Sequence, residues 1–296
     1  MGKHILVTGG TGLIGSSLIQ KLESRDHSIA VLSRSKKGKH KTFVWDYKKN
    51  YIEEGAFEGV DTVVHLAGAG VADEKWTADR KKEILNSRTE TTALLYQSIK
   101  DTENKVKTFI GASAIGFYGS DTEEVLLDET APVGNDFLAE VTEAWETSAV
   151  KMTDLGLRTA LIRIGIVLSK NGGALQELLK PPVAAPLGNG KQFMSWVHIE
   201  DLVNMFVHVI ENDSMEGVFN GVGTQPLSNK DFTKIAAKVY KKPYIPIPVP
   251  AFALKLLMGE MADIVLGGSK VSANKIIKSG FKHDFEKLEL ALKDLK

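Results

Sequence analysis

Cysteine is absent from this 296-residue sequence, which excludes disulfides, zinc–thiolate sites, iron–sulfur clusters and cysteine nucleophiles. Net charge is absent too, since 37 Lys and Arg balance 37 Asp and Glu. A protein that covers nucleic acid or an anionic membrane with a basic surface does not have this balance. The seven His residues show no metal-ligand spacing such as His-Glu-x-x-His, so we expect no metal site. Any chemistry therefore relies on oxygen and nitrogen side chains or on a bound organic cofactor.

Long hydrophobic runs are also missing. The longest uncharged run, from His4 to Gln20, falls short of the roughly 20 apolar residues that span a bilayer, and Gly, Thr and Ser interrupt it. The first residues show no apolar region followed by a small-residue cleavage site. We therefore expect a cytoplasmic protein whose partner is a small-molecule substrate, with no nucleic-acid or membrane partner. The sequence leaves an oligomer open.

The first two-thirds of the chain alternates short β-type runs with amphipathic helical stretches. Strands that alternate with helices form βαβ units, with a parallel sheet and helices on both faces. The pattern predicts an α/β fold, a Rossmann-type doubly wound parallel sheet, over residues 1–165. The expected strands are 4–8, 29–33, 43–45, 60–66, 106–112 and 157–164, and the expected helices begin near residue 13 and span 74–100 and 136–155.

After residue 165 the pattern loosens and predicts a smaller C-terminal α+β lobe over residues 166–296. One strand of this lobe can return to the main sheet. Proline-rich residues 242–250 cannot form a regular helix, and we expect them to wrap an exposed edge. Helices are expected at 200–211, 228–240, 251–266 and 284–295.

Three glycines form the clearest chemical motif. They follow the spacing Gly-x-x-Gly-x-x-Gly between an expected strand and an expected helix, the context of the dinucleotide-binding fingerprint. Gly9 allows the tight turn, Gly12 lets the backbone approach a pyrophosphate, and Gly15 lets helix and strand pack closely. The pyrophosphate would lie at the helix N-terminus, and the alternative is a purely structural turn. The residues expected to bind the cofactor here are Gly9, Thr11, Gly12, Leu13, Ile14 and Gly15.

The end of the second expected strand indicates which dinucleotide binds. NAD-binding proteins usually carry Asp or Glu there to hold the ribose 2′-OH. Here the strand ends in Ser33 and Arg34, and seven Lys and Arg but one acid lie between Ser33 and Asn50. A guanidinium pairs bidentately with a phosphate, so Arg34 suits the 2′-phosphate of NADP(H). We expect NADP(H) rather than NAD(H), the alternative being a solvated basic loop.

Several further motifs follow the glycines along the chain. Together with Thr8–Gly15, the segments Trp45-Asp46, His65–Gly68 and Ser113–Gly119 resemble extended short-chain dehydrogenases/reductases, the NAD(P)-dependent epimerases and dehydratases of sugar nucleotides. The resemblance covers essentially the whole chain. It narrows to an atypical branch, named simply epimerase family proteins, that carries an extra C-terminal segment. The marks of this branch are Phe137–Glu140, Trp145-Glu146, Arg163–Leu168, Gly172–Leu175, Ser195–His198 and Gly280-Phe281.

The resemblance implies roles for residues around the cofactor. Asp46 would hydrogen-bond the adenine amino group, the alternative being a turn residue. Ser113 would lie near the nicotinamide, or is a small residue that ends a strand. Arg88 is a candidate for the cofactor edge or the cleft. The residues that would pass beneath the cofactor ribose are Leu66, Ala67 and Gly68.

The sequence departs from the family where a proton must move. Hydride transfer to or from a carbinol needs an acid or base beside the reacting oxygen, and the family uses a Tyr-x-x-x-Lys pair on one helix. Here Phe137 stands at the Tyr position and Val141 at the Lys position. The candidate catalytic residues are Ser113 and Tyr118, the latter being a replacement proton donor or a packing aromatic. Residues expected to line the cleft as well are Glu140, Ser195, Trp196 and His198.

Charge patterning bears on the substrate. Nine acids and no Lys or Arg lie between Asp121 and Glu146. An acidic rim repels a phosphorylated or nucleotide-sugar substrate unless the acids point away from the cleft. The alternative is a solvated acidic face.

Two functions stay open for an NADP(H)-binding protein of this kind. One is an atypical oxidoreductase or epimerase-type enzyme that acts on an unknown small molecule between the lobes. The other is a catalytically silent protein that binds NADP(H) as a structural or sensing ligand and acts through a partner. The missing Tyr-x-x-x-Lys pair favours the second, and the intact glycine motif and second lobe favour the first.

Overall fold

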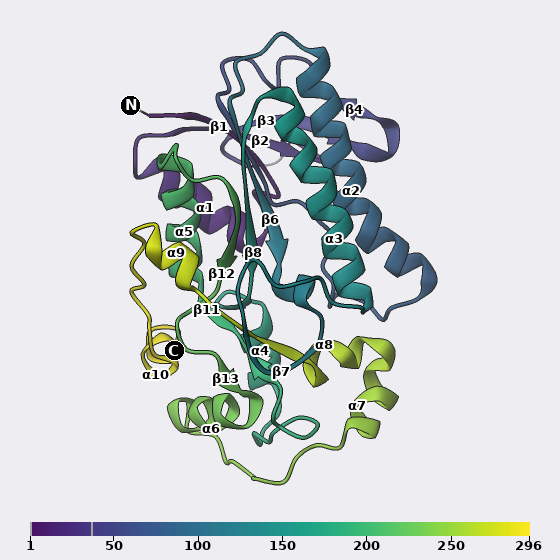
Figure 1. Ribbon diagram of the computed structural model, residues 1–296, viewed down its shortest axis with the longest axis vertical. Helices are drawn as coiled ribbons and strands as arrows, with labels where there is room; N and C mark the ends of the chain where they lie inside the picture. Colours follow the sequence, from purple (N-terminus) through teal and green to yellow (C-terminus); the bar gives the residue numbers. More distant parts are fainter. Residues whose placement is uncertain (1, 37) are drawn as a thin grey trace.

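An eight-stranded sheet forms the centre of the computed structural model, which describes residues 2–36 and 38–296, with the backbone alone at 121–123 (Figure 1). Its strand order is β12-β8-β6-β5-β1-β2-β3-β4, and its pairings are parallel except that of β3 with β4. The predicted Rossmann-type α/β fold is confirmed. The strands are β1 (His4–Thr8), β2 (Ser28–Ser33), β3 (Lys41–Asp46), β4 (Tyr51–Ile52), β5 (Thr62–His65), β6 (Thr108–Ala114), β8 (Arg158–Ile164) and β12 (Gly217–Gly221).

Helices cover both faces of this sheet. Figure 1 places α1 (Leu13–Glu23) and α5 (Ile199–Glu211) on one side, and α2 (Ala78–Asp101) and α3 (Phe137–Val150) on the other. Successive side chains of a strand point to opposite faces, so β1 serves both helical layers. Ile5 and Val7 join the core beneath α1 and α5, and Leu6 joins the core beneath α2. The helices hold the strand ends, and the loops that follow them, in fixed positions.

Three two-stranded pairs and shorter helices build the C-terminal part. The parallel pairs are β7 (Asp121–Leu127) with β14 (Gly268–Val271) and β9 (Ile166–Leu168) with β11 (Trp196–His198), and β10 (Phe193–Met194) pairs antiparallel with β13 (Leu227–Ser228). Because β12 joins the main sheet while β7 joins the C-terminal part, the two parts exchange strands. A division at residue 165 stays a prediction. The helices are α4 (Ala174–Leu179), α6 (Asn229–Tyr240), α7 (Ala251–Met258), α8 (Asp263–Leu266), α9 (Asn274–Lys278) and α10 (Leu288–Asp294).

Some element boundaries differ from those predicted. The helix expected over 251–266 is interrupted, because a 3-10 turn at Gly259–Ala262 separates α7 from α8 and Gly259 takes a positive φ of 63°. Strand β7 was not predicted, since its sequence begins with three acids within four residues. Among the described residues, no helix combines the length and the apolar character that crossing a bilayer requires.

Candidate functional site

The glycine motif forms a tight turn between β1 and α1. Gly9 takes a φ of 71°, and the amide of Gly12 donates to its carbonyl oxygen over 3.0 Å. A Cβ on Gly15 would overlap the Gly9 carbonyl oxygen, so helix and strand approach as closely as backbones can. Thr11 and Gly12 are exposed, and no side chain caps the first turn of α1. Unpaired N–H groups at this helix end therefore face outward, as an anion-binding turn requires.

Two hydrophobic residues begin α1. Leu13 and Ile14 are half-buried, and a Cβ placed on Gly173 would lie 3.3 Å from Leu13 Cδ2. The loop before α4 therefore lies against the start of α1. This contact sets the C-terminal part of the chain beside the glycine turn.

The end of β2 carries no acid. Ser33 is half-buried and Arg34 is exposed. Within the described part of the chain, Arg34 forms no ion pair, while its neighbour Lys36 pairs with Glu53 over 2.6 Å. Strand β2 pairs in parallel with β1, so Arg34, the residue directly after β2, lies at the same edge of the sheet as the glycine turn that follows β1.

Asp46 ends β3 and makes local contacts. Its Oδ1 accepts from the amide of Lys48 over 3.0 Å, which starts the turn Tyr47–Lys49, and its Oδ2 lies 3.5 Å from the Lys49 ammonium. The turn role that the sequence left open is thus present. An adenine contact from the same carboxylate stays a prediction.

The end of β5 is fixed by buried polar contacts. Thr8 Oγ1 accepts from the amides of Leu66 (3.2 Å) and Ala67 (3.1 Å) and lies 2.7 Å from His65 Nδ1. The other ring nitrogen of His65 lies 3.2 Å from Thr91 Oγ1. Burial, with the nearby charge of an arginine, lowers the pKa of His65 to about 3. His65 is therefore a neutral core histidine that holds the β5 end against β1.

Gly68, which follows this end, lies against Arg88 of α2. A Cβ on Gly68 would be 3.3 Å from Arg88 Cζ. The guanidinium stacks over the Trp145 ring at 5.1 Å, and its Nη1 donates to the Ile84 carbonyl over 2.8 Å. Arg88 thus lies between the β5 end and α3.

A buried polar network joins β6, α3, β8 and β12. The register of the parallel strands sets Ser113, Arg163 and Asn220 side by side at their carboxyl ends. Arg163 donates to both carboxylate oxygens of Glu146 over 2.8 Å, and Ser113 donates to the same carboxylate over 2.5 Å. Arg163 also donates to Tyr118 Oη over 3.0 Å, and Tyr118 donates to Asn220 over 2.7 Å.

This network sets the protonation of its members. Burial opposes the charge of Arg163, but the hydrogen bonds that it donates to Glu146 and the negative charge of Glu146 outweigh burial. The pKa of the guanidinium therefore lies above its ordinary value. Burial raises the pKa of the Tyr118 phenol although Arg163 opposes the shift. Tyr118 therefore stays protonated and directs its proton at Asn220. Ser113 directs its proton at Glu146, which leaves its oxygen to accept a hydrogen bond.

Sequence reasoning assigned no role to Glu146, Arg163 or Asn220. One pattern signals them: a charged residue within the apolar strand Leu161-Ile162-Arg163-Ile164 needs a buried partner. The partner itself depends on how α3 packs on the sheet.

The face that α3 turns toward this network also differs from the one predicted. A Cβ on Gly116, in the turn after β6, would lie 3.3 Å from Leu138 and 3.5 Å from Thr142 Oγ1. Phe137 instead packs against Trp76, with ring centroids 4.9 Å apart. Leu138 and Thr142, one position after Phe137 and Val141, therefore face the turn after β6, and the assignment of Phe137 and Val141 to the two catalytic positions stays a prediction. Neither pair of residues supplies a phenol or an ammonium.

The second-lobe residues expected in the cleft are part of the core. Trp196 and His198 are each 1% exposed, and His198 stacks on Phe285 with ring centroids 3.8 Å apart. Ser195 donates to the Ser269 carbonyl over 2.6 Å, which fastens β14 to the lobe. The expectation that these residues line a cleft is wrong, because they hold the C-terminal part together.

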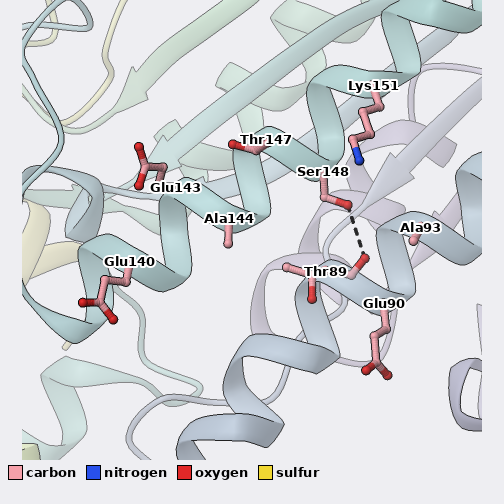
Figure 2. A pocket seen from close by; sticks show the side chains of 9 residues that line it. All are labelled: Thr89, Glu90, Ala93, Glu140, Glu143, Ala144, Thr147, Ser148 and Lys151. Atoms are coloured by element: carbon pink, nitrogen blue, oxygen red, sulfur yellow. Dashed lines mark hydrogen bonds between the residues drawn. The ribbon is translucent and has the colours of Figure 1, made fainter.

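Two of the three acids of α3, Glu140 and Glu143, point away from the network, to which the third, Glu146, belongs. Figure 2 shows Glu140 and Glu143 on a groove of about 570 Å³ between α2 and α3, where Ser148 donates to the Thr89 carbonyl over 3.3 Å. This groove lies on the outer face of the two helices, so it is not the cofactor cleft. Since Glu146 is neutralised by Arg163, these acids do not make the cleft negative.

Two family models match the chain. That of the NAD-dependent epimerase/dehydratase family matches residues 5–220, and a domain of unknown function, DUF1731, matches residues 249–295. The chain is 37% identical over 300 residues to the epimerase family protein SDR39U1 homolog, chloroplastic, of Arabidopsis thaliana, covering 98% of this chain and 85% of that relative. It is 34% identical to epimerase family protein SAR0825 of Staphylococcus aureus, covering 99% of each. The crystal structure of human epimerase family protein SDR39U1 with NADPH superposes with a TM-score of 0.88 at 29% identity, covering 99% of this chain and 98% of that one.

Proposed function

This chain belongs to the NAD-dependent epimerase/dehydratase family, and from that premise we propose that it binds NADP(H) and acts as an atypical oxidoreductase or epimerase-type enzyme on a small molecule. The observation that carries the proposal is the turn Gly9–Gly15, whose close backbone approach leaves no room for a side chain at Gly15. The human relative solved with NADPH supports the choice of cofactor. We propose that the protein acts in the cytoplasm on a small-molecule partner. Light scattering would measure whether it forms oligomers.

The described residues fit such a cofactor. The open N-terminus of α1, with Thr11 and Gly12 exposed, would hold the pyrophosphate. Ser33 and Arg34 would hold the 2′-phosphate at the end of β2, and Asp46 would contact the adenine. Gly68, with Leu66 and Ala67, would pass beneath the ribose.

NADPH is expected to raise the Tm of the full chain more than NADH does at equal concentration, because a ligand of the native state stabilises it according to its affinity. Arg34→Ala should remove this difference and weaken NADPH binding about ten- to a hundredfold, as the loss of a charge-assisted contact does. Thermal shift and fluorescence titration measure both effects.

Arg25→Ala is the control, since Arg25 is an exposed arginine whose guanidinium lies 2.6 Å from Glu211. It should leave the preference for NADPH unchanged. Equal shifts with both dinucleotides would overturn the choice of NADP(H), and no shift with either would overturn cofactor binding itself.

Ser113 and Tyr118 are the residues that we propose for proton transfer. When bound, NADP(H) supplies or accepts a hydride, so side chains must orient the substrate and move a proton. Ser113 lies at the carboxyl end of β6, where parallel α/β sheets bind ligands. Its oxygen can accept a substrate hydroxyl because its own proton points to Glu146.

Ser113→Ala is expected to lower turnover about 10²- to 10⁴-fold while NADPH affinity stays unchanged, the range found for proton transfer by a positioned side chain. NADPH oxidation measured over a panel of carbonyl compounds gives the activity. Turnover that survives Tyr118→Phe would exclude Tyr118 as the proton donor. Unchanged turnover in both variants would remove the whole assignment.

A second function is favoured by one observation. Helix α3 contains no Tyr or Lys, and the residues nearest the turn after β6 are Leu138 and Thr142. These residues suit a catalytically silent protein that senses NADP(H). Tight NADPH binding without oxidation of NADPH by any compound of the panel would decide for this function.

A further inference from the structure

Helix α2 carries two arginines, Arg80 and Arg88, whose surroundings differ. The guanidinium of Arg80 lies 2.9 Å from Glu83 and 3.6 Å from Asp73, and it donates to the Gly70 carbonyl over 2.6 Å. Arg88, two turns further along, lies against Gly68 and the Trp145 ring instead. The first arginine is thus neutralised by acids, and the second is held by an aromatic ring and a backbone.

The charge of Arg88 has no counter-charge in the described structure. Burial, followed by the charge of Arg80, lowers the pKa of Arg88 to about 10, and no acid acts to raise it. The same positive charge contributes to the low pKa of His65. One carbonyl, that of Ile84, accepts from the guanidinium. Arg88 is half-buried, and a partly desolvated charge without a partner is unfavourable, so the site gains stability when an anion binds.

In the proposed function, the anions of the cofactor would be bound elsewhere on the sheet. The pyrophosphate site follows β1 and the 2′-phosphate site follows β2. Arg88 lies on the other side of β1, beside the end of β5 and next to the helix that carries Glu146, the partner of Ser113. The part of the cofactor that extends toward Ser113 is a neutral ribose with its nicotinamide. An anion at Arg88 therefore belongs to a second ligand.

We propose that Arg88 binds an oxyanion of the substrate, a carboxylate or a phosphate group, between the end of β5 and helix α3, which carries the Ser113 partner Glu146. The assignment rests on the proposed function and names its substrate class, an anionic small molecule. A planar guanidinium with free N–H groups pairs with such a group bidentately. The outward-facing acids Glu140 and Glu143 do not oppose its entry.

Stability without any ligand gives the first test. Arg88→Met keeps the length of the side chain and removes an uncompensated charge, so we expect the Tm of the unliganded chain to rise by about 2–4 °C. Arg80→Met is the matched control on the same helix. It removes the partner of Glu83, Asp73 and the Gly70 carbonyl and should lower the Tm. A fall in Tm for Arg88→Met, similar to that for Arg80→Met, would show a structural arginine and overturn the proposal.

Ligand binding gives the second test. Succinate or inorganic phosphate, at an ionic strength matched with sodium chloride, should raise the Tm of the NADPH-loaded chain, and uncharged succinamide should not. Arg88→Met should abolish the rise and Arg88→Lys should retain part of it. The anion that raises the Tm, succinate or inorganic phosphate, shows whether Arg88 binds a carboxylate or a phosphate group. No response to either anion, or an equal response in Arg88→Met, overturns the proposal.

Measuring NADPH binding tests the proposed function separately from the assignment of Arg88 to a substrate anion. Arg88→Met should leave the NADPH Kd within about threefold of the wild-type value, and a loss of tenfold or more would assign Arg88 to the cofactor and overturn the proposal. If the wild-type chain binds no NADPH, the proposed function fails. The stability test, and the same anion titration carried out on the chain without NADPH, then still decide on Arg88.

Discussion

Glu146→Ala is expected to destabilise the protein by about 3–5 kcal/mol, the largest effect that we predict for a single side chain. The substitution leaves the Arg163 guanidinium, a residue 3% exposed, without its bidentate partner and leaves the Ser113 hydroxyl without its acceptor. Urea denaturation of the full chain, with and without NADPH, measures the loss.

The double variant Glu146→Leu with Arg163→Met is the control. Removing both charges together should cost less than Glu146→Ala alone, because no uncompensated charge remains, although Tyr118 loses one hydrogen bond. A double variant whose loss equals the sum of the losses of Glu146→Leu alone and Arg163→Met alone would show that the charges act independently. The network would then not be the unit described above.

The same network shows how far sequence reasoning reaches. The turn Gly9–Gly15 was predicted because its geometry depends on residues that are neighbours in the chain and on the helix that follows. Arg163 and Glu146 are 17 positions apart and meet only because α3 packs over β6 and β8. No local pattern encodes the rotation of a helix about its own axis. Which residues of α3 face the turn after β6 depends on this rotation.

The pairing of strands that lie far apart in the sequence could not be predicted either. Strand β7 ends in Leu126 and Leu127, which pair with Lys270 and Val271 of β14 far along the chain. The acidic first half of β7 does not resemble a buried strand. Its partner, β14, is distant in the sequence. Strands β1, β5 and β6 are instead buried on both faces and therefore appear as continuous apolar runs. The sheet was predictable where burial is complete, and the edges were not.

Gly15→Ala is expected to impair both folding and cofactor binding. Its Cβ would overlap the Gly9 carbonyl oxygen and lie 2.9 Å from Gly10 Cα, and these are backbone atoms that cannot rotate away. Relief requires that α1 move from β1, which should cost about 1–3 kcal/mol of stability, as overpacking does. The same movement displaces the N–H groups at the start of α1, so NADPH binding should weaken more than about tenfold.

Gly12→Ala separates the two effects. Gly12 has an ordinary φ of −75°, and a Cβ there would meet one atom, the Gly9 carbonyl oxygen, at 3.3 Å. Stability should therefore stay within about 0.5 kcal/mol of the wild type. The methyl group would nevertheless stand over the exposed first turn of α1, where the pyrophosphate must approach the backbone, so NADPH affinity should fall about tenfold or more. NADPH affinity could stay unchanged in Gly12→Ala while Gly15→Ala loses stability. That result would show that the turn only allows α1 to pack on β1 and that the cofactor does not bind at the start of α1.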